Sequence, residues 1–349
     1  MKTGILTFQD ANNYGAVLQA YALKKAACRY GETDVINYYN PYFHLINASG
    51  HFKQQITQLL YKKDKLKRQI RFQAFVEKYV VDSKPIVKRD ELKSLNDKYD
   101  HFITGSDQVW NLECSGNDSS YFLDFADSEK KSSYAASFGK QSVSHQEEIK
   151  KFLCDYRNIS VREKSGQKII FELLSEKIPV VVDPSLLLKK EDWQRDFSLN
   201  FEKKYVLVYE VLVGNQLFND AVKFAKAHQL DVICITSSNK PRFCKQVIRD
   251  AGPIEWLRLF AGAAYVFTNS FHGVAFSINF HKQFFVEQLP PPAKTNTRIV
   301  ELLEKLQINA RSSASTETSI DIDYERVDSR LNLLRDDSYE YLKGIVSNE

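Results

Sequence analysis

The feature that most constrains the fold of this chain is a strand, turn and helix pattern that begins twice along its length. The first begins at the N-terminus, where a β-rich stretch over residues 2–8 precedes a turn around Gly15 and apolar residues at helical spacing up to Gly31. A second strand is expected over residues 34–39. A strand, a helix and another strand in this order form one βαβ unit of a parallel sheet.

The pattern begins again after residues 189–204, a polar stretch that we expect to be a linker. Residues 205–211 form an apolar run typical of a buried strand, and helical spacing follows it. A chain of 349 residues is also longer than one hydrophobic core usually grows. We therefore expect two Rossmann-like, doubly wound α/β domains, residues 1–188 and 205–325, and a C-terminal helix in residues 326–349 that packs across their junction.

The loops that follow the strands are where function is expected. Open α/β sheets bind ligands in the crevice outside the carboxyl ends of their strands. We expect the two domains to face a central cleft that both sets of loops line.

The composition argues against several other classes of protein. A formal net charge of +4 is small for this length and argues against nucleic-acid binding. The densest basic run, residues 62–71, fits a solvated helix face or a contact with anionic lipid. The N-terminus reads as a strand rather than a signal peptide, and no stretch has the roughly 18 to 20 apolar residues of a membrane-spanning helix. With five scattered cysteines, a cytoplasmic protein is expected, one able to contact the inner membrane face peripherally.

The sharpest candidate site is TNSFHGVAFS, residues 268–277, which joins an apolar strand to an apolar helix. We expect Ser270 to cap this helix and Phe271, His272 and Gly273 to be its first residues. The N–H groups and dipole of a helix N-terminus bind anions, and a glycine lets a phosphate approach the backbone closely. A bound phosphate dianion would favour a charged imidazole, so His272 is a candidate proton donor; a core or capping histidine is the alternative.

A second candidate is GSDQVWN, residues 105–111, directly after the strand predicted over residues 99–104. Its polar groups and its indole ring suit a carbohydrate, with Trp110 stacking on a sugar face. The alternative is that such residues satisfy only the local backbone of a turn. The predicted contacts to an acceptor come from Asp107, Gln108, Trp110 and Asn111, together with Asn13 and Tyr14 of the first loop.

Cations for an anionic donor are expected from two loops. Arg162 follows a predicted strand and presents a fork of N–H groups that fits a carboxylate or phosphate, although a surface ion pair is the rival interpretation. Lys294 and Arg298 lie in PPPAKTNTR, ahead of a helix. Asp183, which precedes a proline at the end of VVVDP, is expected to be structural.

These segments together resemble the polysaccharide pyruvyl transferase family. The resemblance rests on NYGAVLQAYAL, GSDQVWN, SVRE, VDPSLLL and NSFHGVAFS, in this order over nearly the whole chain. It implies a fold similar to GT-B glycosyltransferases, phosphoenolpyruvate as donor, and a hexose of a cell-surface glycan or its lipid-linked precursor as acceptor. It also implies no metal and no cofactor, His272 as the catalytic histidine, and Arg162 as a donor-binding cation. One position departs from the family, because Ser270 stands where better characterised members have an arginine.

The expected reaction is the formation of a pyruvyl ketal. His272 would protonate the donor, Arg162 and Arg298 would hold its phosphate and carboxylate, and Asp107 would orient or deprotonate the acceptor hydroxyl. Two other functions stay open at this point. One is a glycosyltransferase that uses a nucleotide sugar, and the other is a non-catalytic sugar-binding protein of polysaccharide assembly.

Overall fold

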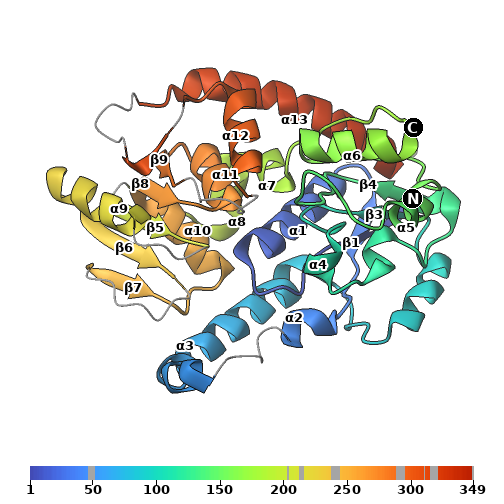
Figure 1. Cartoon of the computed structure of the whole chain (residues 1–349), viewed down its shortest axis with the longest axis horizontal. Helices are drawn as coiled ribbons and strands as arrows, with labels where there is room; N and C mark the ends of the chain where they lie inside the picture. The colour runs from blue at the N-terminus through green and yellow to red at the C-terminus, as the bar shows by residue number, and fades with distance from the viewer. Residues whose placement is uncertain are drawn as a thin grey trace. The chain divides into compact units, whose positions relative to one another are not determined.

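The fold is described from a computed structural model, over residues 1–45, 52–202, 204–211, 216–236, 244–287, 295–309, 311–314 and 321–347. Contacts divide the chain into two compact units. Figure 1 shows the whole chain, with colours that run from the N-terminus to the C-terminus. The first unit comprises residues Met1–Ser49, Gln73–Leu187 and Asn332–Glu349, and the second comprises Gly50–Phe72 and Leu188–Leu331. Both units therefore contain pieces of the chain that are far apart in sequence.

The first unit is built on a parallel sheet with the strand order β2-β1-β3-β4. Its strands are β1 (Lys2–Leu6), β2 (Glu32–Val35), β3 (His101–Thr104) and β4 (Lys131–Ser133). Isolated parallel bridges, Ser132 to Asn158 and Val161 to Val180, continue the same pattern beyond β4. Because β1 has β2 on one side and β3 on the other, the loops after β1 and β3 meet at a switch point.

The helices up to Leu187 belong to the first unit, except that residues Phe52–Phe72 of α3 group with the second unit. The predicted helix after β1 is present as α1, and the long helix α3 continues into a π-helical turn. The observed helices are α1 (Tyr14–Ala27), α2 (Pro41–Leu45), α3 (Phe52–Phe75), the π-helical turn Val76–Val80, the 3-10 helices Arg89–Asp97, Ser119–Phe122 and Ser128–Lys130, α4 (Leu112–Ser115), α5 (Gln146–Leu153), α6 (Lys164–Leu174) and α7 (Pro184–Leu187).

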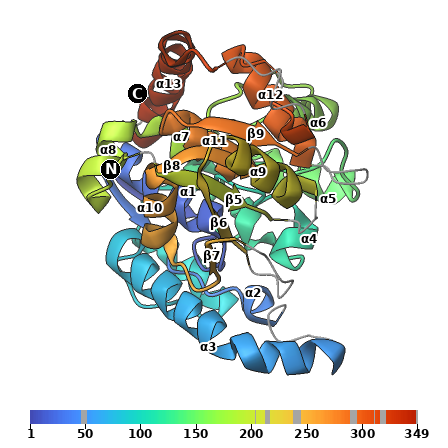
Figure 2. The same cartoon turned by 90° about the vertical axis from the view of Figure 1, so that its left-hand side faces the viewer.

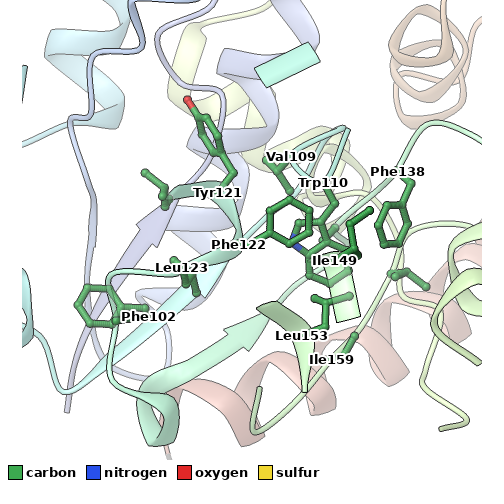
Figure 3. Close-up of a cluster of buried hydrophobic side chains, with 14 of the residues drawn as sticks. Phe102, Val109, Trp110, Tyr121, Phe122, Leu123, Phe138, Ile149, Leu153 and Ile159 are labelled. Atoms are coloured by element: carbon green, nitrogen blue, oxygen red, sulfur yellow. The ribbon is translucent and has the colours of Figure 1, made fainter. Parts of the chain in front are cut away.

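A large aromatic core fills the first unit. Figure 3 shows its centre, where the ring of Trp110 lies among Phe122, Phe138 and Ile149. Trp110 and Phe122 stack, with ring centroids 6.0 Å apart and planes inclined by 10°. These rings come from the segments after β3 and β4, so the core fixes the loops that begin at the ends of those strands.

The second unit has a five-stranded parallel sheet with the order β7-β6-β5-β8-β9, which can be followed in Figure 2. Its strands are β5 (Tyr205–Tyr209), β6 (Asp231–Ile235), β7 (Gln246–Ile248), β8 (Ala263–Thr268) and β9 (Gln283–Val286). The chain runs outward from β5 to β7 and then crosses to β8 on the other side of β5. The switch point of this doubly wound sheet therefore lies between β5 and β8.

Helices cover both faces of this sheet because successive strand residues point to opposite sides. Val206 and Val208 pack against the apolar side of α9 (Gln216–Ala227). Tyr209 instead meets the ring of Trp256 in α10 (Pro253–Gly262), at a centroid distance of 5.5 Å. Trp256 in turn contacts Phe276 of α11 (Phe271–Asn279), so α10 and α11 share the second face.

The polar stretch over residues 189–204 differs from its prediction as a linker. It contains α8 (Lys190–Phe197), a helix whose Trp193 and Phe197 are buried. The two aromatic residues are four positions apart and lie on one face, and the polar residues between them hide this signal. The remaining helices are α12 (Thr295–Leu306) and α13 (Tyr324–Ser347).

A buried histidine in β3 makes the stability of the first unit depend on pH. Burial, and secondarily the charge of Arg157, lowers the pKa of His101 from 6.5 to about 4. The unfolded chain therefore takes up a proton on this group before the folded chain does, and stability falls as the pH drops from 6.5 to about 4. We expect His101 to account for a loss of about 3 kcal/mol over this window.

This expectation is checked by chemical denaturation of the wild type and of the His101→Leu variant across the same window. Leucine has a similar volume and does not titrate. The difference in the free energy of unfolding between the two proteins should shift by about 3 kcal/mol in favour of the variant as the pH falls. A difference that stays constant with pH would rule out the buried neutral histidine.

Candidate functional site

The switch point of the second unit holds two loops against each other. Tyr209 at the end of β5 pairs with Thr268 at the end of β8, and the Thr268 hydroxyl donates to the carbonyl of Tyr209 at 2.8 Å. Two residues after Tyr209, the Val211 N–H donates to the Oδ1 of Asn269, the residue after Thr268, at 2.8 Å. The side chain of Asn269 thus ties the loop after β5 to the loop after β8, at the place where doubly wound sheets bind ligands.

The start of α11 lies directly behind this tie, and its predicted cap is confirmed. Ser270 is the N-cap residue and its Oγ accepts a hydrogen bond from the Gly273 N–H at 3.3 Å. Phe271, His272 and Gly273 follow as the first three helical residues. The first turn of the helix, with its positive dipole end, therefore begins at the switch point.

The requirement for glycine at position 273 comes from packing rather than from phosphate binding. A Cβ atom at this position would lie 2.3 Å from the Thr268 Oγ1, far closer than van der Waals contact. The glycine lets the first turn of α11 approach the end of β8. We expected it to admit a phosphate to the backbone, but its N–H is the one that Ser270 caps.

His272 and Arg298 lie around the same aromatic ring. The imidazole of His272 meets the ring of Phe271 edge-on, at a centroid distance of 5.2 Å. The guanidinium carbon of Arg298, in α12, is 5.7 Å from the centroid of that ring. Both polar side chains are 9% exposed. The second unit therefore brings together a histidine, an arginine and a helix N-terminus, while Lys294 lies outside the described residues.

Sequence reasoning did not single out two residues of this site. Asn269 ties the loops together, and Glu210, the first residue after β5, is a carboxylate that is buried at the switch point. Each directly follows a strand of the central pair, which is the signal that could have identified them once the strand order was known.

The first unit has a similar tie at its own switch point. The Thr7 hydroxyl, after β1, donates to the Ser106 carbonyl at 3.1 Å, after β3. Gln19 of α1 then joins both loops, because its amide group donates to Thr7 Oγ1 at 2.8 Å and accepts from the Ser106 N–H at 3.2 Å. The start of GSDQVWN is therefore held in place by buried hydrogen bonds.

Arg162 sits within a cluster of carboxylates in this unit. Its Nη1 is 2.8 Å from Asp183 Oδ2. Its Nε is 3.4 Å from Glu163 Oε2, and its Nη2 is 3.8 Å from Asp107 Oδ1. The Arg162 side chain is 3% exposed, so the contacts lie away from solvent. The hydroxyl and N–H of Ser185 donate to the other oxygen of Asp183, at 2.7 and 3.0 Å.

The charges of this cluster indicate a role for Arg162 other than the predicted one of binding the anionic donor. Burial alone would lower the pKa of Arg162, but the carboxylates of Asp183, Glu163 and Asp107 raise it overall. One cation faces three carboxylates, which is unlike a pocket for a phosphate dianion. The contacts are those of a residue that holds buried carboxylates together, and Asp183 is its main partner.

Asp107 is the member of the cluster that precedes the half-buried Gln108. Its backbone is in the left-handed region, with φ of 71°, and its Oδ1 accepts from the Gln108 N–H at 2.8 Å. The same oxygen is the one that faces Arg162. Among the described residues no hydrogen bond or ion pair engages its Oδ2, which leaves this oxygen for a ligand.

Trp110 corrects the prediction of a stacking platform for a sugar. Its side chain is 1% exposed and stacks on Phe122 inside the core of the first unit, as Figure 3 shows. Because the indole ring is buried by its neighbours in the core, neither of its faces is accessible to a ligand. The tryptophan anchors the loop instead.

The other predicted acceptor residues are engaged mainly in local structure. Asn111 caps α4 through the Glu113 N–H, and its amide donates to Gln108 Oε1 at 3.3 Å. Asn13 is exposed, and its Oδ1 caps α1 through the Gly15 N–H at 2.9 Å. Tyr14 is buried as the first residue of that helix. Asn13 and the half-buried Gln108 remain at the surface of the first unit, whereas Asn111 and Tyr14 do not.

The described residues contain no group of three or more histidines, cysteines and carboxylates placed to hold a metal ion.

The fold is similar to those of several enzymes of known structure, and no curated protein matches the chain. A Listeria monocytogenes protein described as a UDP-N-acetylglucosamine 2-epimerase is 9% identical, with a TM-score of 0.50 over 100% of this chain and 94% of that chain. The UDP-GlcNAc 2-epimerase of Neisseria meningitidis is 10% identical, with a TM-score of 0.49 over 99% and 94%. These are GT-B fold proteins, and the prediction of an α/β fold of this kind with two parallel sheets is confirmed.

The sequence itself matches a family model over residues 13–286. This range contains Asp107, Arg162 and His272, and it covers most of the chain. The model is that of the polysaccharide pyruvyl transferases, and the chain belongs to this family.

Proposed function

We propose that this protein transfers the pyruvyl group of phosphoenolpyruvate to two hydroxyls of a hexose, where it forms a ketal. The hexose would belong to a cell-surface polysaccharide or to its lipid-linked precursor. Membership of the pyruvyl transferase family supports the transfer reaction. The observation that carries the choice of donor is the grouping of His272 and Arg298 around Phe271 at the start of α11.

The second unit would bind the donor. Phosphoenolpyruvate carries a phosphate and a carboxylate, and the first turn of a helix together with a guanidinium suits such an anion. Arg298 would supply the positive charge that is missing at Ser270, since its guanidinium reaches the ring of the residue that follows Ser270. Because Arg298 is largely buried, its charge acts in a medium that screens it less than water does.

His272 would act as the general acid on the donor. Protonation of the methylene carbon creates an oxocarbenium-like centre at the neighbouring carbon, which one sugar hydroxyl attacks. The bond from this carbon to the phosphate oxygen then breaks, and the second hydroxyl closes the ketal. Of the two protons that the hydroxyls lose, one balances the proton now in the methyl group and the other leaves with the phosphate.

The first unit would bind the acceptor. Asp107 has a carboxylate oxygen available for a sugar hydroxyl, and its other oxygen is fixed by Gln108 N–H and by Arg162. In this proposal Arg162 orients Asp107, whereas the phosphate is bound by Arg298. Asn13 and Gln108 would add hydrogen bonds to the sugar. Asp107 would accept the proton of the attacking hydroxyl as general base.

The donor assignment is tested by ligand-induced thermal stabilisation of the full chain. A ligand that binds only the folded state at 100 times its Kd stabilises it by about 2.7 kcal/mol. Phosphoenolpyruvate should raise the Tm of the wild type, and should raise it much less for Arg298→Gln. Stabilisation by uridine diphosphate without any by phosphoenolpyruvate would instead favour a nucleotide-sugar glycosyltransferase.

A further inference from the structure

One helix carries an unusual share of the charge of this chain. The segment KKDKLKRQIR, residues 62–71 of α3, contains six lysines and arginines and one aspartate, a formal charge of +5. The whole chain has a formal charge of +4, so the rest of it is slightly acidic on balance. Positive charge is therefore concentrated on this helix rather than spread over the surface.

One face of the helix packs against other parts of the second unit. On the engaged face, Arg71 Nη1 donates to the Asp250 carbonyl at 2.7 Å, and its Nε is 3.6 Å from Glu255 Oε1. Arg68 lies over the ring of Phe72, 5.2 Å from its centroid, and Phe72 is buried. These contacts fix the orientation of α3 about its own axis.

The opposite face exposes two large apolar side chains. Leu66 and Ile70 are each 55% exposed and are four residues apart, so they lie on adjacent turns of one face. Few large apolar side chains of the described chain are exposed to this degree, and these two are adjacent. The helix can be found as α3 in Figure 2.

Exposed lysines surround this apolar pair. Lys62 and Lys63 precede Leu66 by one turn of the helix, and Lys65 and Lys67 are its immediate neighbours. Lys67 also forms an ion pair on the side of the engaged face, with its Nζ 3.8 Å from Asp250 Oδ2. An apolar centre within a border of lysines is the pattern of helices that lie in the plane of a membrane interface.

We propose that the exposed face of α3 is a docking surface for a bilayer that contains anionic phospholipid. Leu66 and Ile70 would enter the acyl boundary, while Lys62, Lys63 and Lys65 contact the phosphate headgroups. Each lysine near an anionic membrane contributes about 1 kcal/mol. The helix would lie on the membrane and not cross it, since among the residues that the structure describes no helix is apolar enough over a sufficient length.

The apolar pair distinguishes a membrane from other polyanions. A nucleic acid or an acidic glycan is recognised by cations and hydrogen bonds, and neither has an apolar phase into which Leu66 and Ile70 would insert. A bilayer offers both the charges and the apolar phase. The proposal goes beyond pyruvyl transfer and does not depend on it, because lipid binding is measured without donor or acceptor.

Vesicle co-sedimentation of the full chain tests the proposal. The wild type should sediment with vesicles made of equal parts phosphatidylglycerol and phosphatidylcholine, and not with phosphatidylcholine alone. Binding should weaken as salt is added. Loss of three lysine contacts corresponds to about 100-fold weaker binding at roughly 1 kcal/mol each. The first variant to test is therefore Lys62→Gln/Lys63→Gln/Lys65→Gln.

A second variant and two controls make the outcome specific. Leu66→Gln/Ile70→Gln should lower binding at least tenfold although its charge is unchanged. The matched controls change lysines and large apolar residues at other exposed sites and should bind as the wild type does; they are Lys168→Gln/Lys177→Gln/Lys226→Gln and Phe171→Gln/Leu333→Gln. The proposal is overturned if the wild type ignores anionic vesicles, if the controls lose as much binding, or if the apolar variant binds fully.

Discussion

Replacement of His272 by alanine is expected to lower turnover on the order of 10²-fold or more while the fold is retained, because a positioned general acid contributes at least this much. The imidazole lies in the first turn of α11 beside Phe271, and its side chain is not part of the cap that starts the helix. Removal of the imidazole should therefore slow the chemical step and leave the folding of the protein intact. The measurement is phosphate release from phosphoenolpyruvate in the presence of an acceptor, together with the Tm of each variant.

The matched control is His281→Ala. His281 follows the same helix, but its Nε2 is 3.1 Å from Asp328 Oδ1 and its ring stacks on Tyr324. This histidine belongs to a packing contact and should leave turnover nearly unchanged. A folded His272→Ala protein with turnover close to that of the wild type would remove His272 from the mechanism.

Replacement of Trp110 by alanine is expected to lower the free energy of unfolding by about 3 to 5 kcal/mol, the usual cost of deleting a large buried aromatic side chain. Trp110 stacks on Phe122 and packs against Phe138 in the core of the first unit. Urea denaturation of the wild type and the variant measures this difference.

Phe171→Ala is the control for the effect of Trp110. Phe171 is 57% exposed, and its replacement should change stability by about 0.5 kcal/mol or less. A Trp110→Ala protein of unchanged stability that fails to bind the acceptor sugar would restore the stacking role.

The sequence was sufficient to predict elements whose signals are local. The helix α11 begins at the predicted cap because a serine, an apolar run and a strand before it are all contiguous. The parallel pairing of the strands followed from the alternation of strands and helices.

What the sequence could not give depends on contacts between distant segments. Arg162 meets Asp107 and Asp183, which lie 55 residues before it and 21 residues after it, and no local pattern links these three. The burial of Trp110 depends on rings from the segments after β3 and β4. In the same way, residues Gly50–Phe72 and Asn332–Glu349 each group with a unit that is not contiguous with them in sequence.

The residues at the switch point of the second unit could be predicted only in part from the sequence. The loops after β5 and β8 were predicted from the strands, yet the pairing of these strands is known only from the sheet order. Asn269 and Glu210 can be recognised as site residues only once the strand order is known. Asn269 then accepts a hydrogen bond from Val211, the residue that follows Glu210.

The most direct test of this account is mass spectrometry of hexose acceptors after incubation with the protein and phosphoenolpyruvate. Pyruvyl transfer predicts an acceptor that gains the mass of one pyruvyl ketal, in step with the release of one phosphate, and that gains it on the order of 10²-fold more slowly with His272→Ala. If the wild type modifies no acceptor of a broad library and releases no phosphate, or transfers a sugar from a nucleotide sugar instead, the account is contradicted.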